Sequence, residues 1–151
     1  MLDFDLVNEK VRRITGSPHY GGDFGDVIED AAVILSNVES SDIKKHFPSD
    51  YLKFIKCVGF GELDASFYFD DGPSHYMKTY GRSIDKLDGM YVFASDQSEY
   101  VFAFDSKNNW QVVDVDSSGD VENIIARDFA EFIDVKLNDL IEIVDWREKN
   151  F

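Results

Sequence analysis

Hydrophobic residues along this chain follow a helical spacing at both ends and a strand-like spacing between them. Near the start, Phe4, Val7, Val11 and Ile14 recur every three or four residues, which is one stripe of an amphipathic helix. Stripes of this kind predict helices over residues 1–14, 26–37, 48–58, 127–133 and 137–147. Ser40 or Ser41 is expected to cap a further short turn that reaches Phe47.

The middle of the chain is rich in aromatic and β-branched residues that alternate with polar ones. Short runs of this type, separated by Asp, Ser, Asn and Gly, predict β-strands over residues 65–70, 90–95, 99–105 and 110–116. Residues 74–88 show no clear period and are expected to form a loop. The order of helices, then strands, then helices predicts an α+β fold: an antiparallel or mixed sheet, packed on one face by several helices.

The last three predicted strands form a meander whose register can be tested from the pattern. If their connections hold three and four residues, Ser95 faces Glu99 and Asp105 faces Trp110, and side chains alternate between the two faces of the sheet. The face expected under the helices is nearly all apolar and holds Met90, Val92, Ala94, Tyr100, Phe102, Phe104, Gln111, Val113 and Val115. The other, mixed face holds Tyr91, Phe93, Ser95, Glu99, Val101, Ala103, Asp105, Trp110, Val112, Asp114 and Asp116.

Length and charge narrow the range of functions. With 151 residues the chain is expected to be a single domain with a sizeable core. Its 30 acidic and 15 basic residues leave a net charge of −15, which repels nucleic acids and anionic membranes and attracts a basic partner. Solubility alone is the simpler explanation of the same charge. With no apolar run of membrane-spanning length and no signal peptide, a cytoplasmic protein is expected.

Several sequence motifs that could bind a ligand or act in catalysis lack a residue that such a site requires. The glycine-rich residues 17–25 lack the Lys-Ser/Thr of a phosphate-binding loop. Residues 114–121 match the first positions of a calcium loop, but Ile125 stands at the twelfth, where a glutamate is required. The three histidines are scattered, and Cys57 is expected to be a half-buried filler. We therefore expect no catalytic residues, no metal and no cofactor.

Several short motifs follow one another in a fixed order along the chain. They are Phe47-Pro48-Ser49-Asp50-Tyr51-Leu52-Lys53-Phe54-Ile55, Gly59-Phe60-Gly61-Glu62-Leu63, Phe93-Ala94-Ser95-Asp96, Tyr100-Val101-Phe102-Ala103-Phe104-Asp105 and Ala126-Arg127-Asp128-Phe129-Ala130-Glu131-Phe132-Ile133. Together and in this order they resemble the motifs of the SUKH superfamily. The resemblance covers residues 26–135 and leaves the helices over residues 1–14 and 137–147 as additions. It implies an α+β domain without catalytic residues.

The resemblance implies two functions that belong to different classes. The superfamily includes many bacterial immunity proteins, so the first is an antitoxin that binds and neutralises a polymorphic toxin domain, expected to be a basic nuclease. The second is a regulatory or scaffold module, as the yeast cell-wall-assembly regulator in the same superfamily suggests. An immunity gene would directly follow a large toxin gene, so genomic context separates the two.

The mixed face of the meander and its surroundings are the expected partner-binding surface. Aromatic anchors ringed by carboxylates suit a protein interface that attracts a basic partner. The residues expected to bind it are Tyr91, Glu99, Asp105, Trp110, Asp114 and Asp116, together with Asp70 and Asp71 at the end of the first predicted strand. The alternative is that the carboxylates form a solvated strand face and that the aromatics pack against the N-terminal helix.

Overall fold

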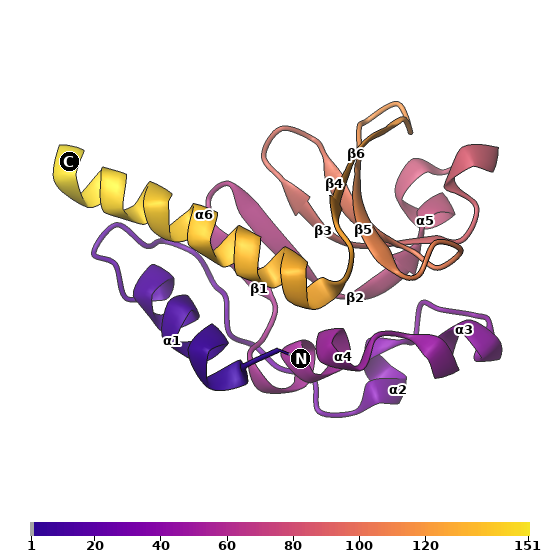
Figure 1. Ribbon diagram of the computed structural model, residues 1–151, viewed down its shortest axis with the longest axis horizontal. Helices are drawn as coiled ribbons and strands as arrows, with labels where there is room; N and C mark the ends of the chain where they lie inside the picture. Colours follow the sequence, from indigo (N-terminus) through magenta and orange to yellow (C-terminus); the bar gives the residue numbers. More distant parts are fainter. Residues whose placement is uncertain (1) are drawn as a thin grey trace.

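The chain folds into a six-stranded antiparallel sheet flanked by helices, as the computed structural model shows for residues 2–151 (Figure 1). Met1, which belongs to the helix predicted over residues 1–14, lies outside the described residues. The helices are α1 (Phe4–Thr15), α2 (Ala31–Ile34), α3 (Ser41–His46), α4 (Ser49–Cys57), α5 (Tyr76–Tyr80), the 3₁₀ turn η1 (Asp85–Leu87) and α6 (Phe129–Asn150). The strands are β1 (Gly61–Asp64), β2 (Phe67–His75), β3 (Met90–Asp96), β4 (Val101–Asp105), β5 (Gln111–Val115) and β6 (Val121–Ala126).

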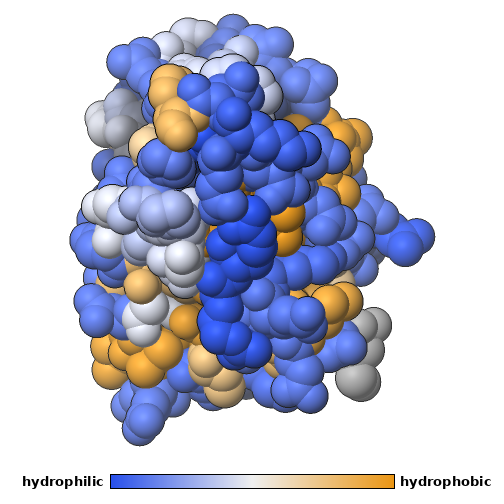
Figure 2. Space-filling model, turned by 90° about the vertical axis from the view of Figure 1, so that its left-hand side faces the viewer, coloured by the Kyte–Doolittle hydropathy of each residue, from blue (hydrophilic) through white to orange (hydrophobic). Residues whose placement is uncertain are grey.

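The strands lie side by side in their chain order, from β1 at one edge to β6 at the other. The long helix α6 crosses the sheet with α1 beside it, and α2, α3 and α4 follow along the same layer (Figure 1). The surface toward which the end of α6 points is mostly hydrophilic, with apolar groups in separate patches (Figure 2). The predicted α+β fold is therefore confirmed.

Side-chain caps fix where several helices begin. The Asp3 carboxylate accepts hydrogen bonds from the backbone N–H groups of Asp5 and Leu6, and the Ser40 hydroxyl accepts one from Ile43. Each satisfies a donor that the first helical turn leaves free. Pro48 directly precedes α4, and the Asp128 carboxylate caps α6 through Glu131 N–H at 2.9 Å. The predicted serine cap is thus confirmed, whereas Pro48, which is the first residue of the helix predicted over residues 48–58, lies just outside α4 as its N-cap residue.

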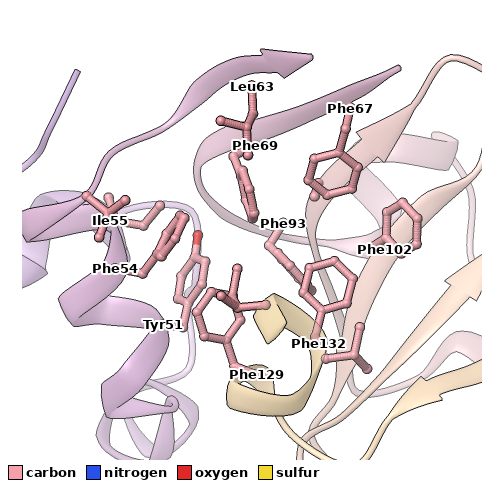
Figure 3. Close-up of a cluster of buried hydrophobic side chains, with 14 of the residues drawn as sticks. Tyr51, Phe54, Ile55, Leu63, Phe67, Phe69, Phe93, Phe102, Phe129 and Phe132 are labelled. Carbon is pink, nitrogen blue, oxygen red and sulfur yellow. The ribbon is translucent and has the colours of Figure 1, made fainter. Parts of the chain in front are cut away.

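Aromatic rings fill the space between the sheet and helices α4 and α6 (Figure 3). Tyr51 and Phe54 of α4 meet Phe129 of α6 with ring centroids 5.4 and 5.5 Å apart. On the sheet, Phe93 stacks on Phe104 at 4.3 Å. Edge-to-face and offset pairs at these distances add stability beyond area burial, so this cluster is the main core of the protein.

The opposite face of the sheet is also covered, but by much less chain. Tyr76 of α5, Ile84 and Leu87 pack against a second, smaller apolar cluster on that face. Its strand members are Met90, Val92, Ala103, Val113 and Val115. The segment expected to be a loop over residues 74–88 therefore contains α5 and η1 and buries the second face.

The predicted register of the meander is wrong, and the two faces of the sheet are exchanged over most of it. Ser95 pairs with Val101, not Glu99, and Asp105 pairs with Gln111, not Trp110. The first turn is longer than predicted because the Asp96 carboxylate accepts from the N–H groups of Ser98 and Tyr100. A bulge between Val92 and Ala94 shifts the alternation again within β3.

The exchange changes which side chains lie under the helices. Tyr91, Phe93 and Val112 of the predicted mixed face belong to the main core. Met90, Val92, Val113 and Val115 of the predicted apolar face lie on the other side of the sheet, in the second cluster. Phe102 and Phe104 of β4 remain in the main core, as predicted, because the change of pairing exchanges the faces of the neighbouring strands β3 and β5 and not those of β4.

Other element boundaries also differ from the prediction. The strand predicted over residues 65–70 continues through Asp71-Gly72-Pro73 to His75, with an irregularity in its pairing between Phe69 and Ser74. Gly72 is required there, since a Cβ would lie 2.2 Å from the Ile34 carbonyl oxygen. The helix predicted over residues 26–37 shortens to α2, the two C-terminal helices are one continuous α6, and β1 and β6 were not predicted. Cys57, expected to be half-buried, is exposed.

Candidate functional site

Carboxylates gather at one end of the sheet, where β3 and β5 end and β4 and β6 begin. Asp96 ends β3 and Glu99 lies in the turn that follows it, while Asp114, Asp116, Asp120 and Glu122 come from β5, the following turn and β6. Asp139 of α6 joins them, since it lies close enough to Lys136 to act on its charge together with Asp96 and Asp114. We call these seven acids, with Tyr100 among them, the acidic rim.

The carboxylates of the rim act on one another and on Tyr100. The pKa of Glu122 is raised, first because it shares a hydrogen bond with Asp116 and also through the charges of Asp114 and Asp120. The pKa of Tyr100 is raised above its usual value of 10.0, chiefly by Glu122 and further by Asp114, Asp116 and Asp96. Like charges held this close disfavour each other's ionised form, and a positively charged side chain placed beside them would relieve this repulsion.

Hydrogen bonds within the turn hold part of the rim in place. The Asp116 carboxylate accepts from the Ser118 hydroxyl at 2.7 Å and from the Asp120 N–H at 3.0 Å, and these bonds lower its pKa to about 2. Asp114 accepts from the Asn123 N–H at 2.8 Å, across the β5–β6 pair. Asp116 therefore stays ionised, and its side chain also has a structural role in the turn.

Two lysines lie near the rim, and each already interacts with other side chains of the protein. Lys86 forms an ion pair with Asp120. Lys136 is half-buried with its ammonium group 4.8 Å from the ring centroid of Phe67 and 5.0 Å from that of Phe102. Burial lowers the pKa of Lys136, while Asp139, Asp96 and Asp114 partly oppose this. Asp96, Glu99 and Glu122 are left to attract positive charge from outside the protein.

The residues expected to bind a partner do not form one patch. Glu99, Asp114 and Asp116 lie in the acidic rim, whereas Asp105 and Trp110 lie at the opposite end of β4 and β5. Asp105 is buried and its carboxylate accepts from Lys107 N–H and from the Asn108 amide, so it stabilises the turn. Trp110 is half-buried, with its ring centroid 4.8 Å from that of Phe47.

The other three expected residues lie on β2 and β3, away from the rim. Tyr91 is buried between Phe47 and His75, with ring centroids 6.1 and 5.6 Å away. Asp70 is half-buried and Asp71 is exposed. Burial, with the neighbouring Asp71 charge, raises the pKa of Asp70 to about 6. Binding by these residues stays a prediction, but the structure does not place them beside Glu99, Asp114 and Asp116.

Sequence reasoning missed the part of the rim that lies outside the predicted strands. Glu122 was missed because β6 was not predicted, and Asp139 because the helix containing it was not placed over the sheet. One signal was present: Val121, Ile124 and Ile125 directly follow a turn, and β-branched residues in that position indicate a strand. A paired hairpin would have brought Glu122 beside Asp114.

A wide surface hollow lies away from the rim. It has a volume of about 770 Å³ and is lined by residues of the α2–α3 connection and by His75, Met77, Lys78 and Tyr91. The Nδ1 atom of His75 accepts a hydrogen bond from Met77 N–H at 3.2 Å, so this ring caps α5. A smaller hollow of about 370 Å³ lies beside the ion pair of Arg147 and Asp64, whose shortest N–O distance is 2.5 Å.

Comparisons of the sequence with family models and curated proteins do not assign this chain to a family. No family model and no curated protein matches its sequence. Within residues 2–151, no three His, Cys, Asp or Glu side chains lie together in a way that could hold a metal ion. Over the same residues, every helix is too short or too polar to cross a membrane.

Proposed function

We propose that this protein is an immunity protein that binds a toxin domain of basic charge and neutralises it in the cytoplasm. The acidic rim is the observation that carries the proposal, because it gathers carboxylates at one end of the sheet and, within residues 2–151, only Asp120 of them forms an ion pair with the lysines described above. Such a surface steers a basic partner and fixes its orientation. If the toxin is a nuclease, the same carboxylates would occupy the positions where it holds phosphates. The resemblance to the SUKH superfamily supports the same function.

Charge reversal on the rim tests the proposal. The protein is produced with the toxin domain encoded directly upstream of its gene, and the association rate, dissociation rate and cell survival are measured. Glu99→Lys and Glu122→Lys alter exposed side chains. Each should slow association about 10-fold at low salt and reduce its salt dependence, with a smaller effect on dissociation.

Glu9→Lys is the matched control. Glu9 is exposed on α1 and outside the rim, and its replacement changes the net charge by the same amount. This variant should associate almost as fast as the wild type. A wild-type protein that neither binds the toxin nor protects cells would refute the proposed function and leave the regulatory or scaffold module as the better explanation. Equal effects of all three reversals would show that net charge, and not the rim, matters.

A further inference from the structure

The long helix α6 has one flank that the rest of the described chain leaves uncovered. Its buried stripe faces the sheet and consists of Phe129, Phe132, Ile133, Leu137, Leu140 and Val144. Helix α1 covers one side of that stripe through Lys10–Asp134 at 3.2 Å and Arg13–Asp145 at 2.5 Å. At 100° per residue, Val135, Asp139 and Trp146 fall on the other side, away from α1. We call this side, with Ile143 at its border, the free flank.

Large apolar side chains are exposed along the free flank. Val135 is 44% exposed, Ile143 36% and Trp146 57%. The ring of Phe151 lies edge-on to Trp146 with centroids 5.6 Å apart and is itself 81% exposed. Tryptophan is the residue most enriched at the energetic centres of protein interfaces. Trp110, by contrast, is already packed against Phe47 and offers less surface.

The free flank is continuous with the acidic rim. The ammonium group of Lys136, one residue after Val135, lies 5.0 Å from the ring centroid of Phe102 near the start of β4, so the helix meets the end of the sheet where the rim lies. From that point the flank runs along α6 to Trp146, a length of about 16 Å at about 1.5 Å per residue. The combined surface has carboxylates at one end and an aromatic side chain at the other.

The charge of this surface indicates which kind of protein can bind to it. Asp139 lies within the flank, Glu142 borders it, and the rim adds further carboxylates. A second copy of this chain would bring two molecules of net charge −15 together along their acidic sides, which electrostatic repulsion opposes. A basic protein that presents an apolar side chain beside its lysines or arginines satisfies both halves of the surface.

We infer that the free flank of α6 is the apolar half of the partner interface, and that Trp146 is its anchor. This inference rests on the proposed function for the identity of the partner, a basic toxin domain. The rim would set the rate of association, and Trp146, buried on binding, would set the rate of dissociation.

Truncation of the exposed side chains tests the inference with the same toxin domain. Trp146→Ala should speed dissociation roughly 30-fold or more, as expected for an interface centre, and Val135→Ala should have a smaller effect. Tyr68→Ala and Leu6→Ala are matched controls, since these side chains are 42% and 44% exposed outside the flank. All four variants should unfold at nearly the wild-type temperature, because they alter exposed positions. Wild-type dissociation of a folded Trp146→Ala protein would refute the inference and leave the proposed function intact.

A second measurement does not depend on the toxin. A synthetic helical 14-residue peptide of leucine and lysine is titrated into the Trp110→Phe variant, in which Trp146 is the remaining tryptophan. Binding should protect Trp146 from quenching by acrylamide, and Asp139→Lys should weaken the binding of the peptide several-fold. Unchanged quenching at saturation would overturn the inference whatever the toxin does. A dimer in size-exclusion chromatography that dissociates on Trp146→Ala would also overturn it, because a second copy would then occupy the flank.

Discussion

At the scale of single residues, Asp70 is a carboxylate whose burial makes the folded protein less stable at neutral pH. Burial and the charge of Asp71 raise its pKa from 3.8 to about 6. Near it lies the Tyr51 hydroxyl, the one buried side-chain polar atom without a hydrogen-bond partner within residues 2–151. Because the folded state holds the Asp70 proton more tightly than the unfolded state, its contribution to stability is greatest below pH 4 and is lost as the pH rises toward 6.

Asp70→Asn should therefore stabilise the protein at neutral pH. We expect a gain of about 1–2 kcal/mol at pH 7.5, less than the full linkage value because water reaches part of the side chain, and almost no gain near pH 4. Urea denaturation of the variant and the wild type at both pH values measures the difference. Asp71→Asn is the control and should stabilise less, since it removes only the neighbouring charge. Equal stability of Asp70→Asn and the wild type at pH 7.5 would show that the folded state does not resist the Asp70 charge.

At the scale of helices and strands, the aromatic core decides which face of the sheet is buried. The sequence pattern predicts that Phe102 and Tyr100 are buried under the helix over residues 48–58. In the structure Phe102 lies against Phe67 and Phe132, with ring centroids 5.4 and 5.5 Å away, so α6 covers it and not α4. Tyr100, expected beside it in the core, is half-buried in the rim. Phe102 is thus buried as predicted, although the helix that buries it was wrongly identified.

Phe102→Ala should cost about 3–5 kcal/mol of unfolding free energy, as truncation of a buried phenylalanine does. The cavity would open under α6, where Lys136 also loses one of the two rings beneath its ammonium group. Chemical denaturation gives the loss directly. Tyr68→Ala, at a side chain that is 42% exposed on β2, should cost much less. A cost below about 1 kcal/mol for Phe102→Ala would indicate a surface-like position.

Local sequence patterns predicted the helices and strands that bury one regular stripe of apolar residues. They did not predict features that depend on which strands pair with one another. Helices α1 and α4 and the three meander strands could be predicted because their apolar spacing is strong. The bulge at Phe93 could not, since it exists only when β3 pairs with β4. Edge strand β6 shows little apolar period because four of its six residues are exposed. The position of the rim depends on the bulge in β3 and on strand β6. The sequence therefore placed only Glu99, Asp114 and Asp116 of the rim in the candidate site.

At the scale of the whole molecule, the net charge of −15 acts against the folded state as well as toward a partner. Raising the salt concentration from about 0.01 M to about 0.5 M shortens the screening length from about 30 Å to below 10 Å. Repulsion among the carboxylates of the rim and elsewhere should weaken, and the melting temperature should rise by about 2–4 °C, the equivalent of about 1 kcal/mol. Calorimetry across this range measures the shift, and a falling melting temperature would show that ion pairs outweigh the repulsion.

The strand order bears on how the chain reaches its native state. Because each strand pairs with its neighbours in sequence, and only the β2–β3 connection with α5 and η1 is long, most of the sheet can assemble through short loops, which cost little entropy to close. The pairing of α1 with α6 is different, since Lys10 and Asp134 are separated by 124 positions. We expect the meander to form early in folding and α1 to dock late, so that substitutions in α1 change the unfolding rate more than the folding rate.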